Sequence, residues 1–578
     1  MRGLIGNVNH AINILRRYIM RILCAILFFV SVLLMQAQRY EHLIMYGQSL
    51  STGHQSWPPL STTNVPGNYM IGTQVWSNFG NTVFNKFNPL IANVAASTSS
   101  LAKKRATMIC AESPVIAATN HVQLKTNGQH QFIATSSGTG GRTIEELSKE
   151  HYNPVCYAHF TNAIQYASTI SDNIHCPAII WMQGEYNYTV PSGNSGLTSG
   201  SRPTSDKATY KSLMLTLKEN MQADIMKKYN QTDAPLFITY QAGAQYTRGT
   251  YLTVGMAQLE ASNEHDDIVC AGPVYPMTDR GGHLDSNGYR WFGEMLGKVY
   301  YRTKILGEDF KPLQPAEISR TSNPKEIKIR FLVPKLPLVI DEQLVNKVTS
   351  AGFELYLSGA KKIITGVRIE GDCVILTALT DLTGDVEIIY AGTNNAGHGN
   401  LRDSDDYLAF YNYIDLDKRN PDNSYFYPRD AAETTLRPSY EPRDAMGIIY
   451  EQPYPLYNFS VAFYYKLNAS AQTMLVPGLE DYTSVEKVRR NDLFKPYYRN
   501  GMLFIPASEQ DYHRISISTL SGQIIFTWDE PQLIRNENKS YVLPDLSKGI
   551  YFVNIQSEYN QYTSKILVSN IQVENATF

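Results

Sequence analysis

Cysteine is scarce and poorly paired in this 578-residue sequence. One of the six cysteines, Cys24, falls in an N-terminal apolar stretch, and the other five are Cys110, Cys156, Cys176, Cys270 and Cys373. An odd number without a CxxC motif rules out complete pairing but leaves room for one or two disulfides in an oxidising compartment. No Cys or His pair has the spacing of zinc ligands, so the sequence predicts neither a metal nor a cofactor.

The sequence also lacks an excess of positive charge. Its net charge is −2, which gives no basic footprint for nucleic acid and excludes that class of partner. Hydrophobic residues make up 43% and charged residues 18%, as in an ordinary folded protein. At this length we expect two to four domains.

No apolar run is long enough for a comfortable membrane span. The longest, "ILCAILFFVSVLLM" at 22–35, follows Arg16, Arg17 and Arg21 and precedes "QAQ". This order of basic, apolar and small residues predicts a secretory signal over residues 1–38, with cleavage near Ala37. Met20 is an alternative start, since the stretch from there is a complete signal alone. Without residues 1–38, which hold four Arg and no acid, the exported chain has a net charge of −6.

Residues 39–310 alternate apolar, β-rich runs with helical patterns. Runs such as "HLIMYG" (42–47), "PAIIWMQGE" (177–185) and "DDIVCAGPV" (266–274) end in Gly or polar residues. Helix-like stretches such as "YKSLMLTLKENMQADIMKKY" (210–229) lie between the runs. Strands that alternate with helices predict an α/β fold with a parallel sheet covered on both faces.

After residue 310 the helical pattern stops. Segments of 311–465 alternate apolar and polar residues between Gly, Asp and Pro turns, which predicts a β-sandwich domain. Within it "DSDD" (403–406) lacks the full pattern of a calcium loop, so we interpret it as a solvated turn. We assign 466–498 to a linker and 499–578 to a last β-sandwich unit.

Four segments of 39–310 contain residues suited to acyl transfer. "YGQSLSTG" (46–53) presents Ser49 after a strand, and "SSGTGGRTIEEL" (136–147) puts Gly140 and Gly141 before a helix start. Backbone N–H groups at a helix start favour developing negative charge. "WMQGEYN" (181–187) follows another strand with Gln183 and Glu185, and "TDRGGHLDSNGYRWFGE" (278–294) carries Asp279 and His283. Serine becomes a nucleophile only beside a base and an oxyanion hole, which these segments together supply.

In this order the four segments resemble the blocks of SGNH hydrolases, specifically the sialate O-acetylesterase-like carbohydrate esterases. The resemblance covers roughly residues 40–305 and implies a three-layer α/β/α, flavodoxin-like fold. It implies Ser49 as nucleophile and His283 as general base. The oxyanion hole would use the N–H groups of Ser49 and of Gly140 or Gly141, with the Gln183 amide as a third donor.

Two features depart from that family. Leu50 stands where the family often has Asn, and Asp279 lies four residues before His283 instead of three. The glycines between them allow a bulge that absorbs the extra residue, so we predict Asp279 as the triad acid. The alternatives are another carboxylate, with Glu185 the next candidate, or a backbone carbonyl that orients His283.

The last unit resembles a second family. "LSGQII" (520–525), "LPDLSKGIYFVNI" (543–555) and "TSKILV" (563–568) are similar to the C-terminal sorting domain of the Bacteroidetes type IX secretion system. This resemblance implies that the secretion machinery is a partner and that the protein is secreted or displayed at the cell surface.

The sequence therefore predicts a secreted serine esterase that removes O-acetyl groups from carbohydrate, either sialate or plant polysaccharide, through an acyl-enzyme. Two alternatives stay open. One is a non-catalytic glycan-binding or adhesin protein on the same scaffold, and the other is a lipase or thioesterase of the same fold.

Overall fold

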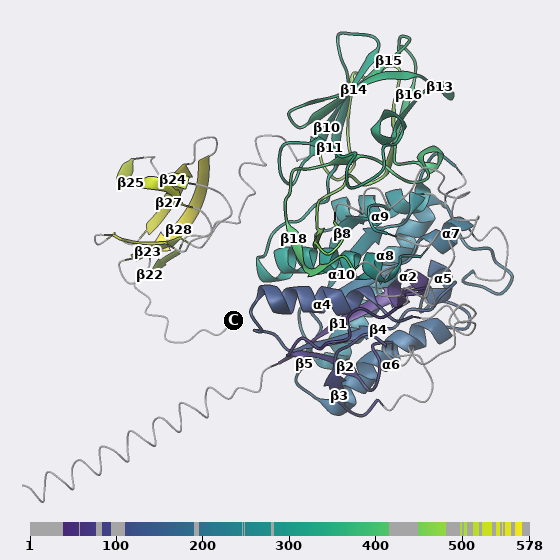
Figure 1. Cartoon of the computed structure of the whole chain (residues 1–578), viewed down its shortest axis with the longest axis vertical. Coiled ribbons are helices and arrows are strands. Elements are labelled where there is room, and N and C mark those ends of the chain that lie inside the picture. The colour runs from purple at the N-terminus through teal and green to yellow at the C-terminus, as the bar shows by residue number, and fades with distance from the viewer. Residues whose placement is uncertain are drawn as a thin grey trace, which may run out of the picture.

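A computed structural model gives the structure of the protein (Figure 1). It describes residues 39–56, 58–76, 84–93, 110–189, 196–244, 247, 249–278, 283–414, 449–480, 497–499, 502–505, 512–519, 523–534, 539–543, 546, 549–556 and 561–568. The predicted signal segment 1–38 and Asp279 lie outside these residues.

The N-terminal part is built on one mixed sheet in the order β3-β2-β4-β1-β6-β7-β8, with β5 paired to β1. Every pairing in it is parallel except that of β2 with β3. The strands are β1 (Tyr40–Gly47), β2 (Asn68–Ile71), β3 (Phe87–Pro89), β4 (Phe132–Ser136), β5 (Ile174–His175), β6 (Ala178–Met182), β7 (Leu236–Gln241) and β8 (Ile268–Pro273).

The order of the strands creates a switch point at β1. The chain runs from β4 on one side of β1 to β6 on the other, and the strands are parallel. At such a point the connections leave the sheet in opposite directions, which opens a crevice at the carboxyl ends of the strands. The segments that follow β1, β4 and β6 therefore meet at one edge of the sheet.

Helices connect these strands. They are α2 (Ser49–Thr52), α4 (Pro114–Lys125), α5 (Ile144–Leu147), α6 (Val155–Ile170), α7 (Glu185–Thr189), α8 (Lys207–Tyr229), α9 (Thr253–Glu264), α10 (Ser286–Tyr300) and the π-helical turn η3 (Tyr301–Ile305). Helices α4 and α10 pack closely because Gly293 and Gly297 face α4. A Cβ atom on Gly293 would lie 2.4 Å from the carbonyl oxygen of Pro114. The predicted α/β architecture is thus confirmed as a mixed fold with a largely parallel sheet.

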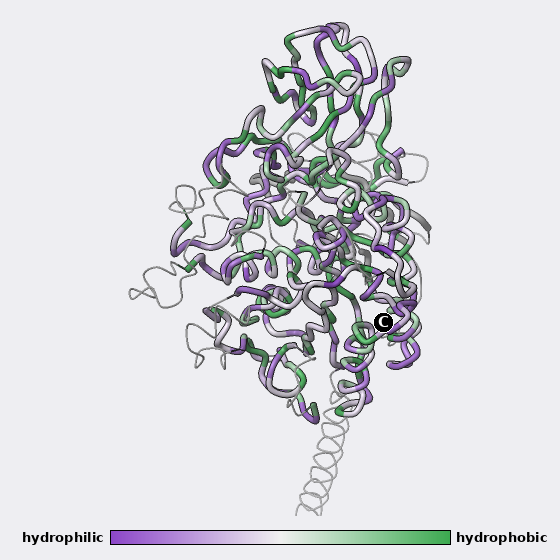
Figure 2. Tube along the Cα trace, turned by 90° about the vertical axis from the view of Figure 1, so that its right-hand side faces the viewer, coloured by the Kyte–Doolittle hydropathy of each residue, from purple (hydrophilic) through white to green (hydrophobic). Residues whose placement is uncertain are grey.

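In the described part of the chain after residue 310, short 3₁₀ turns, η4 (Thr349–Gly352) and η5 (Thr393–Asn395), occur besides the strands. Two larger antiparallel sheets have the orders β14-β15-β10-β9-β21 and β13-β12-β16-β20, and β11 pairs with β17 and β18 with β19. Short hydrophobic and hydrophilic segments alternate along the chain at the top of the molecule, where strands of the two larger sheets lie (Figure 2). The strands are β9 (Gln314–Arg320), β10 (Glu326–Leu332), β11 (Val339–Ile340), β12 (Phe353–Leu357), β13 (Ala360–Lys362), β14 (Ile364–Glu370), β15 (Cys373–Ala378), β16 (Val386–Tyr390), β17 (Leu401–Arg402), β18 (Leu408–Asn412), β19 (Pro453–Pro455), β20 (Phe463–Leu467) and β21 (Thr473–Leu475).

The β region extends beyond residue 465, where the sequence suggested a linker. Strand β20 ends at Leu467 and β21 pairs with β9. One continuous hydrophobic core runs from Leu43 in the sheet to Leu479. The α/β part and the β region therefore share a core, and the segment available as a linker begins after it.

Two aspartates of the "DSDD" segment are buried and only Asp406 is exposed, so our interpretation of the segment as a solvated turn was wrong. Asp403 is fully buried, and Asp405 forms a 2.6 Å ion pair with Lys298 of α10, whose side chain is 1% exposed. The Lys298 ammonium also donates to the Leu456 carbonyl at 2.7 Å. The sequence pattern suggested that Asp405 is exposed because the buried cation that pairs with it lies over a hundred residues away.

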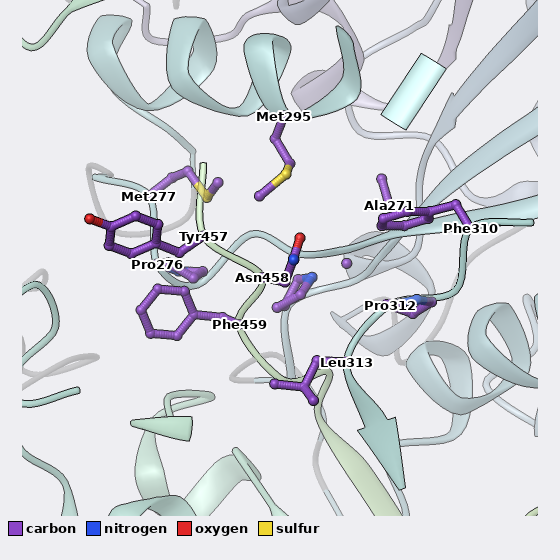
Figure 3. Close-up of a pocket in the computed structure, with 12 residues that line it drawn as sticks. Ala271, Pro276, Met277, Met295, Phe310, Pro312, Leu313, Tyr457, Asn458 and Phe459 are labelled. Carbon is purple, nitrogen blue, oxygen red and sulfur yellow. The ribbon is translucent and has the colours of Figure 1, made fainter. Parts of the chain in front are cut away.

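A small cavity lies where the α/β part meets the β region (Figure 3). Met295 reaches into it from α10, with Phe310 and Leu313 from the connection and Tyr457 and Phe459 from the β region. Its lining contains no acid, base or hydroxyl nucleophile apart from the Tyr457 phenol, so this cavity is a packing gap and not a site of chemistry.

The C-terminal unit, yellow in Figure 1, has its own hydrophobic core, which includes Leu503, Ile517 and Val553. Its sheets have the orders β22-β23-β26 and β25-β24-β27-β28. The strands are β22 (Tyr497–Arg499), β23 (Met502–Ile505), β24 (Tyr512–Thr519), β25 (Ile524–Ile534), β26 (Lys539–Val542), β27 (Gly549–Gln556) and β28 (Gln561–Val568).

Two further observations concern the described residues as a whole. None of their helices is long and apolar enough to cross a membrane. The five cysteines after Cys24 are all within the described ranges, and none of these five forms a disulfide there.

Candidate active site

Ser49 follows β1 at a turn that requires glycine. Gly47 has a φ of 149°, and a Cβ atom there would lie 2.0 Å from the carbonyl oxygen of Met182 at the end of β6. The Gln48 N–H donates to the same carbonyl at 2.9 Å. The chain then enters α2 with Ser49 as its first residue, and Gly53 closes α2 in the left-handed conformation. The hydroxyl thus stands at the carboxyl end of the central strand, on a residue that is 8% exposed.

His283 lies beside this serine, with its Nε2 atom 2.8 Å from Ser49 Oγ. It comes two residues before the N-cap of α10. There Asp285 accepts hydrogen bonds from the Gly288 N–H at 2.7 Å and from the Thr278 hydroxyl at 2.9 Å. The cap fixes the end of the loop that carries His283. Two residues 234 positions apart in the sequence are thereby joined into a serine–histidine pair.

The surroundings of His283 keep its ring neutral. Burial, together with the smaller effect of the nearby His54 ring, whose centroid lies 5.6 Å away, lowers the pKa of His283 to about 4. A neutral imidazole with its hydrogen on Nδ1 presents a lone pair at Nε2, which can accept the Ser49 proton.

The other nitrogen of His283 has an amide partner. Its Nδ1 atom lies 3.0 Å from the Oε1 atom of Gln55, a residue in the left-handed region with a φ of 65°. Asp279, the predicted acid, lies outside the described residues, so its distance from His283 is untested and its role stays a prediction.

The glycine-rich loop after β4 packs directly against the turn that carries Ser49. The Thr139 N–H donates to the Gly47 carbonyl at 2.8 Å, and a Cβ atom at Gly138 would lie 1.9 Å from Ser51 Oγ. The loop therefore requires a residue without a side chain at Gly138 in order to approach this closely.

Of the next two glycines, Gly140 lies beside a neighbour of the Ser49–His283 pair. A Cβ atom at Gly140 would lie 2.9 Å from Cε1 of His54, whose ring neighbours His283. Gly141 has a φ of 63° and open space around its Cβ position. The N–H of Ser49 is the first of α2 and has no acceptor within that helix. The N–H groups of Ser49, Gly140 and Gly141 are the candidates for holding a developing oxyanion.

Gln183 is fully buried after β6, with its amide bonded inside the protein. Its Nε2 atom donates to Asn187 Oδ1 at 2.6 Å and to the Arg142 carbonyl at 3.2 Å, and its Oε1 atom accepts from the Tyr210 hydroxyl at 2.7 Å. Both amide hydrogens therefore have protein acceptors, and donation to an oxyanion would require one of them to leave its partner.

Glu185 is also buried and bonded away from His283. Its carboxylate accepts hydrogen bonds from the Tyr240 hydroxyl and, at 2.9 Å, from the Gly243 N–H. Burial raises the pKa of Glu185. Neither ring nitrogen of His283 contacts this carboxylate, because they face Ser49 and Gln55.

Sequence reasoning missed His54 and Gln55. Both follow the serine motif in "STGHQS", so a polar pair six residues or fewer from the nucleophile was the available signal. His54 Nδ1 lies 2.9 Å from the Thr52 hydroxyl and 3.2 Å from Cys110 Sγ, which holds the ring beside the glycine loop.

Five other histidines have structural partners within the described residues. His121 contacts Glu294, His130 contacts Glu41, His175 contacts Asp233, His159 contacts Thr139, and His151 contacts the Asn153 carbonyl. In the part of the chain that the structure describes, no group of three or more His, Cys, Asp or Glu side chains is arranged to hold a metal ion.

Comparison with known families decides the nature of the last unit. Residues 499–569 match the family described as the secretion system C-terminal sorting domain. This unit is a sorting domain. The predicted resemblance is confirmed, and the protein is exported by type IX secretion to the cell surface or the extracellular space.

Solved structures show weaker similarity to the rest. A carbohydrate acetylesterase from Xanthomonas citri is 15% identical, with a TM-score of 0.41 over 62% of this chain and 77% of that one. NanS is 12% identical, with a TM-score of 0.33 over 46% and 98% of the two chains. A protein from Arabidopsis thaliana is 15% identical, with a TM-score of 0.33 over 45% and 98%. At these scores the similarities carry no weight for the chemistry. No curated protein matches the chain.

Proposed function

We propose that this sorting-domain protein is a secreted serine esterase that removes O-acetyl groups from carbohydrate. The observation that carries the proposal is the 2.8 Å contact between Ser49 Oγ and His283 Nε2. It lies at the switch point of the sheet, where open α/β folds place their sites.

Acylation would begin when Ser49 Oγ attacks the acetyl carbonyl carbon and His283 Nε2 takes the hydroxyl proton. The negative charge that forms on the carbonyl oxygen would be held by the N–H groups of Ser49 and of Gly140 or Gly141. Collapse breaks the bond to the sugar oxygen, which receives the proton from His283 and leaves as an alcohol. Ser49 is then acetylated.

Deacylation would repeat these steps with water. His283 takes a proton from water, the hydroxide oxygen attacks the acetyl-serine carbon, and Ser49 Oγ leaves with the returned proton as acetate departs. In this proposal Asp279 is the acid behind the base and Gln183 a third oxyanion donor, and both roles rest on the resemblance alone.

We further propose the three-layer α/β/α arrangement of SGNH hydrolases for residues 39–310 and a β-sandwich for the β region. Two sets of helix contacts support the three layers. Helix α4 packs on α10, while α8 packs on both α6 and α9. Two antiparallel sheets that share one hydrophobic core support the sandwich.

Acetate release from acetylated xylan, acetylated sialosides and acetylated pectin, with p-nitrophenyl acetate as a general ester, tests this function. We expect turnover of at least one glycan, and we expect Ser49→Ala and His283→Ala to lower kcat by roughly three to six orders of magnitude. A phosphonylating reagent should label Ser49 in the wild type, as seen by peptide mass spectrometry.

The alternatives give different results in the same assay. A wild-type protein that binds these glycans but turns over no ester would be a binding protein on this scaffold. Preference for long-chain acyl esters or thioesters over acetylated glycans would indicate a lipase or thioesterase. Full activity in Ser49→Ala would overturn the proposed mechanism.

A further inference from the structure

We infer that Gln55 is the positioning residue of His283, in place of the Asp279 carboxylate that the family resemblance implies, so that the base is oriented by a neutral amide in the turn after Ser49. The effect of Gln55 on turnover rests on the proposed function. Its structural basis is the 3.0 Å contact between Gln55 Oε1 and His283 Nδ1.

The contact selects the useful form of the ring. An amide oxygen only accepts hydrogen bonds, so the hydrogen of His283 must sit on Nδ1. Nε2 is then left with a lone pair, and it is the atom that lies 2.8 Å from Ser49 Oγ. Gln55 therefore fixes the tautomer of His283, as the orienting carboxylate does in a Ser-His-Asp triad.

The backbone holds Gln55 in a conformation that side chains rarely adopt. Its φ is 65°, and both neighbours are anchored. The Tyr289 hydroxyl donates to the His54 carbonyl at 2.9 Å, and Ser56 Oγ accepts from the N–H groups of Ala111 and Glu112 at 2.9 and 2.7 Å. Backbone strain of this kind persists where surrounding contacts enforce it, and it clusters at functional sites.

Charge distinguishes this arrangement from a triad. An amide carries no charge, so it orients the ring without stabilising the imidazolium. The pKa of His283 is accordingly low, about 4, because burial and the adjacent His54 are not offset by a described anion. The titratable groups that face the ring within the described residues are His54 and, beyond it, Cys110, and Asp279 is on the same loop outside those residues.

Four variants of the full exported chain test the inference. Gln55→Ala removes the amide but keeps a Cβ atom in the strained turn, and Gln55→Gly is its matched control because glycine adopts that φ freely. Gln55→Glu replaces the amide with a carboxylate of almost the same shape. Asp279→Asn tests the predicted acid in the same assays.

We expect Gln55→Ala and Gln55→Gly to lower kcat by roughly a hundredfold with little change in KM, because a misplaced base no longer meets Ser49. Gln55→Glu should retain turnover and raise the pKa of His283 by about one pH unit or more. The acid limb of its kcat/KM profile should move upward, since only the neutral ring acts as base.

The result that overturns the inference is an unchanged kcat and pH profile in every Gln55 variant, with Asp279→Asn inactive. If Gln55→Ala does not fold, the nearly isosteric Gln55→Glu still decides. Titration of His283 by NMR gives a readout without turnover. A pKa raised by Gln55→Glu supports the contact even if no ester is hydrolysed, and only the proposed esterase function then fails.

Discussion

The Cβ position of Gly47 lies 2.0 Å from the carbonyl oxygen of Met182, which makes this glycine a structural condition for presenting Ser49. We expect Gly47→Ala to lower the free energy of unfolding by roughly 3–5 kcal/mol and to abolish esterase activity in the folded remainder. The reason is that neither strand β1 nor strand β6 can retreat within the sheet.

Gly128 provides the matched control for this substitution. Its φ is 79°, but no atom lies within 4 Å of its Cβ position. Gly128→Ala should therefore cost only about 1–2 kcal/mol of left-handed strain and leave kcat unchanged. Urea denaturation of both variants measures the difference, and equal losses would show that the clash with Met182 is relieved by other means.

The pH dependence of the wild type should reflect the low pKa of His283. The neutral ring is the active form, and its pKa is about 4, so kcat/KM should hold from neutral pH to about pH 5 and fall by half near pH 4. An acid limb near pH 6.5 would contradict the buried environment of the ring.

Stability measured at the same pH values separates titration from unfolding. Burial lowers the pKa of His42 to about 3 and of His398 to about 4. Between the ordinary histidine value and these values the unfolded chain binds more protons than the folded one, so stability falls as pH falls through that window. We expect Tm to decrease steadily from pH 6.5 to pH 4, with activity at pH 5 showing that the chain is still folded.

Substitution of Gln183 should have two separable effects, one on stability and one on kcat. Gln183→Ala removes the buried side-chain hydrogen bonds from the Tyr210 hydroxyl and to Asn187 Oδ1, which should lower the free energy of unfolding by about 1–3 kcal/mol. If the amide also donates to the oxyanion, kcat of the folded enzyme should fall by roughly a hundredfold or more with KM unchanged. Asn187→Ala is the control, because it breaks one of the same hydrogen bonds without removing the proposed donor.

Deleting residues 499–578 should separate export from chemistry. The deletion removes the sorting domain, which has a hydrophobic core distinct from that of the remaining chain. The shortened protein should therefore keep its esterase activity but accumulate in the periplasm. Fractionation with an acetate-release assay checks both, and normal appearance at the surface or in the medium would contradict the role of this domain.

Strand-end logic predicted the core of the site from the sequence. Ser49 and the glycine loop come directly after apolar runs, and His283 comes just before a helical pattern, so all of them were expected at one edge of a parallel sheet. The structure brings Ser49 and His283 into contact. The partner of His283 was not predictable in this way. A left-handed conformation at Gln55 has no sequence signal, because it results from anchors on both sides of the turn.

The partners of buried polar groups were equally hidden. The acceptors of Gln183 depend on how α7 and its neighbours pack, and Asp405 finds a buried cation 107 residues away on α10. Periodicity identifies which face of an element is apolar, but it does not identify which distant polar atom will fill a position in the core.

Helix α10 connects the base to the β region. Its first turn is capped two residues after His283, while Glu294 on the same helix accepts the Phe410 and Tyr411 N–H groups at 2.7 and 2.9 Å and Lys298 holds Asp405. A recombinant chain that ends at residue 310 would leave Glu294 and Lys298 without their partners in the β region. It would also remove the contacts that hold α10, the helix whose N-terminus positions His283. The α/β segment therefore cannot be exchanged as an independent unit, and its natural boundary for transplantation or crystallisation lies beyond Leu479.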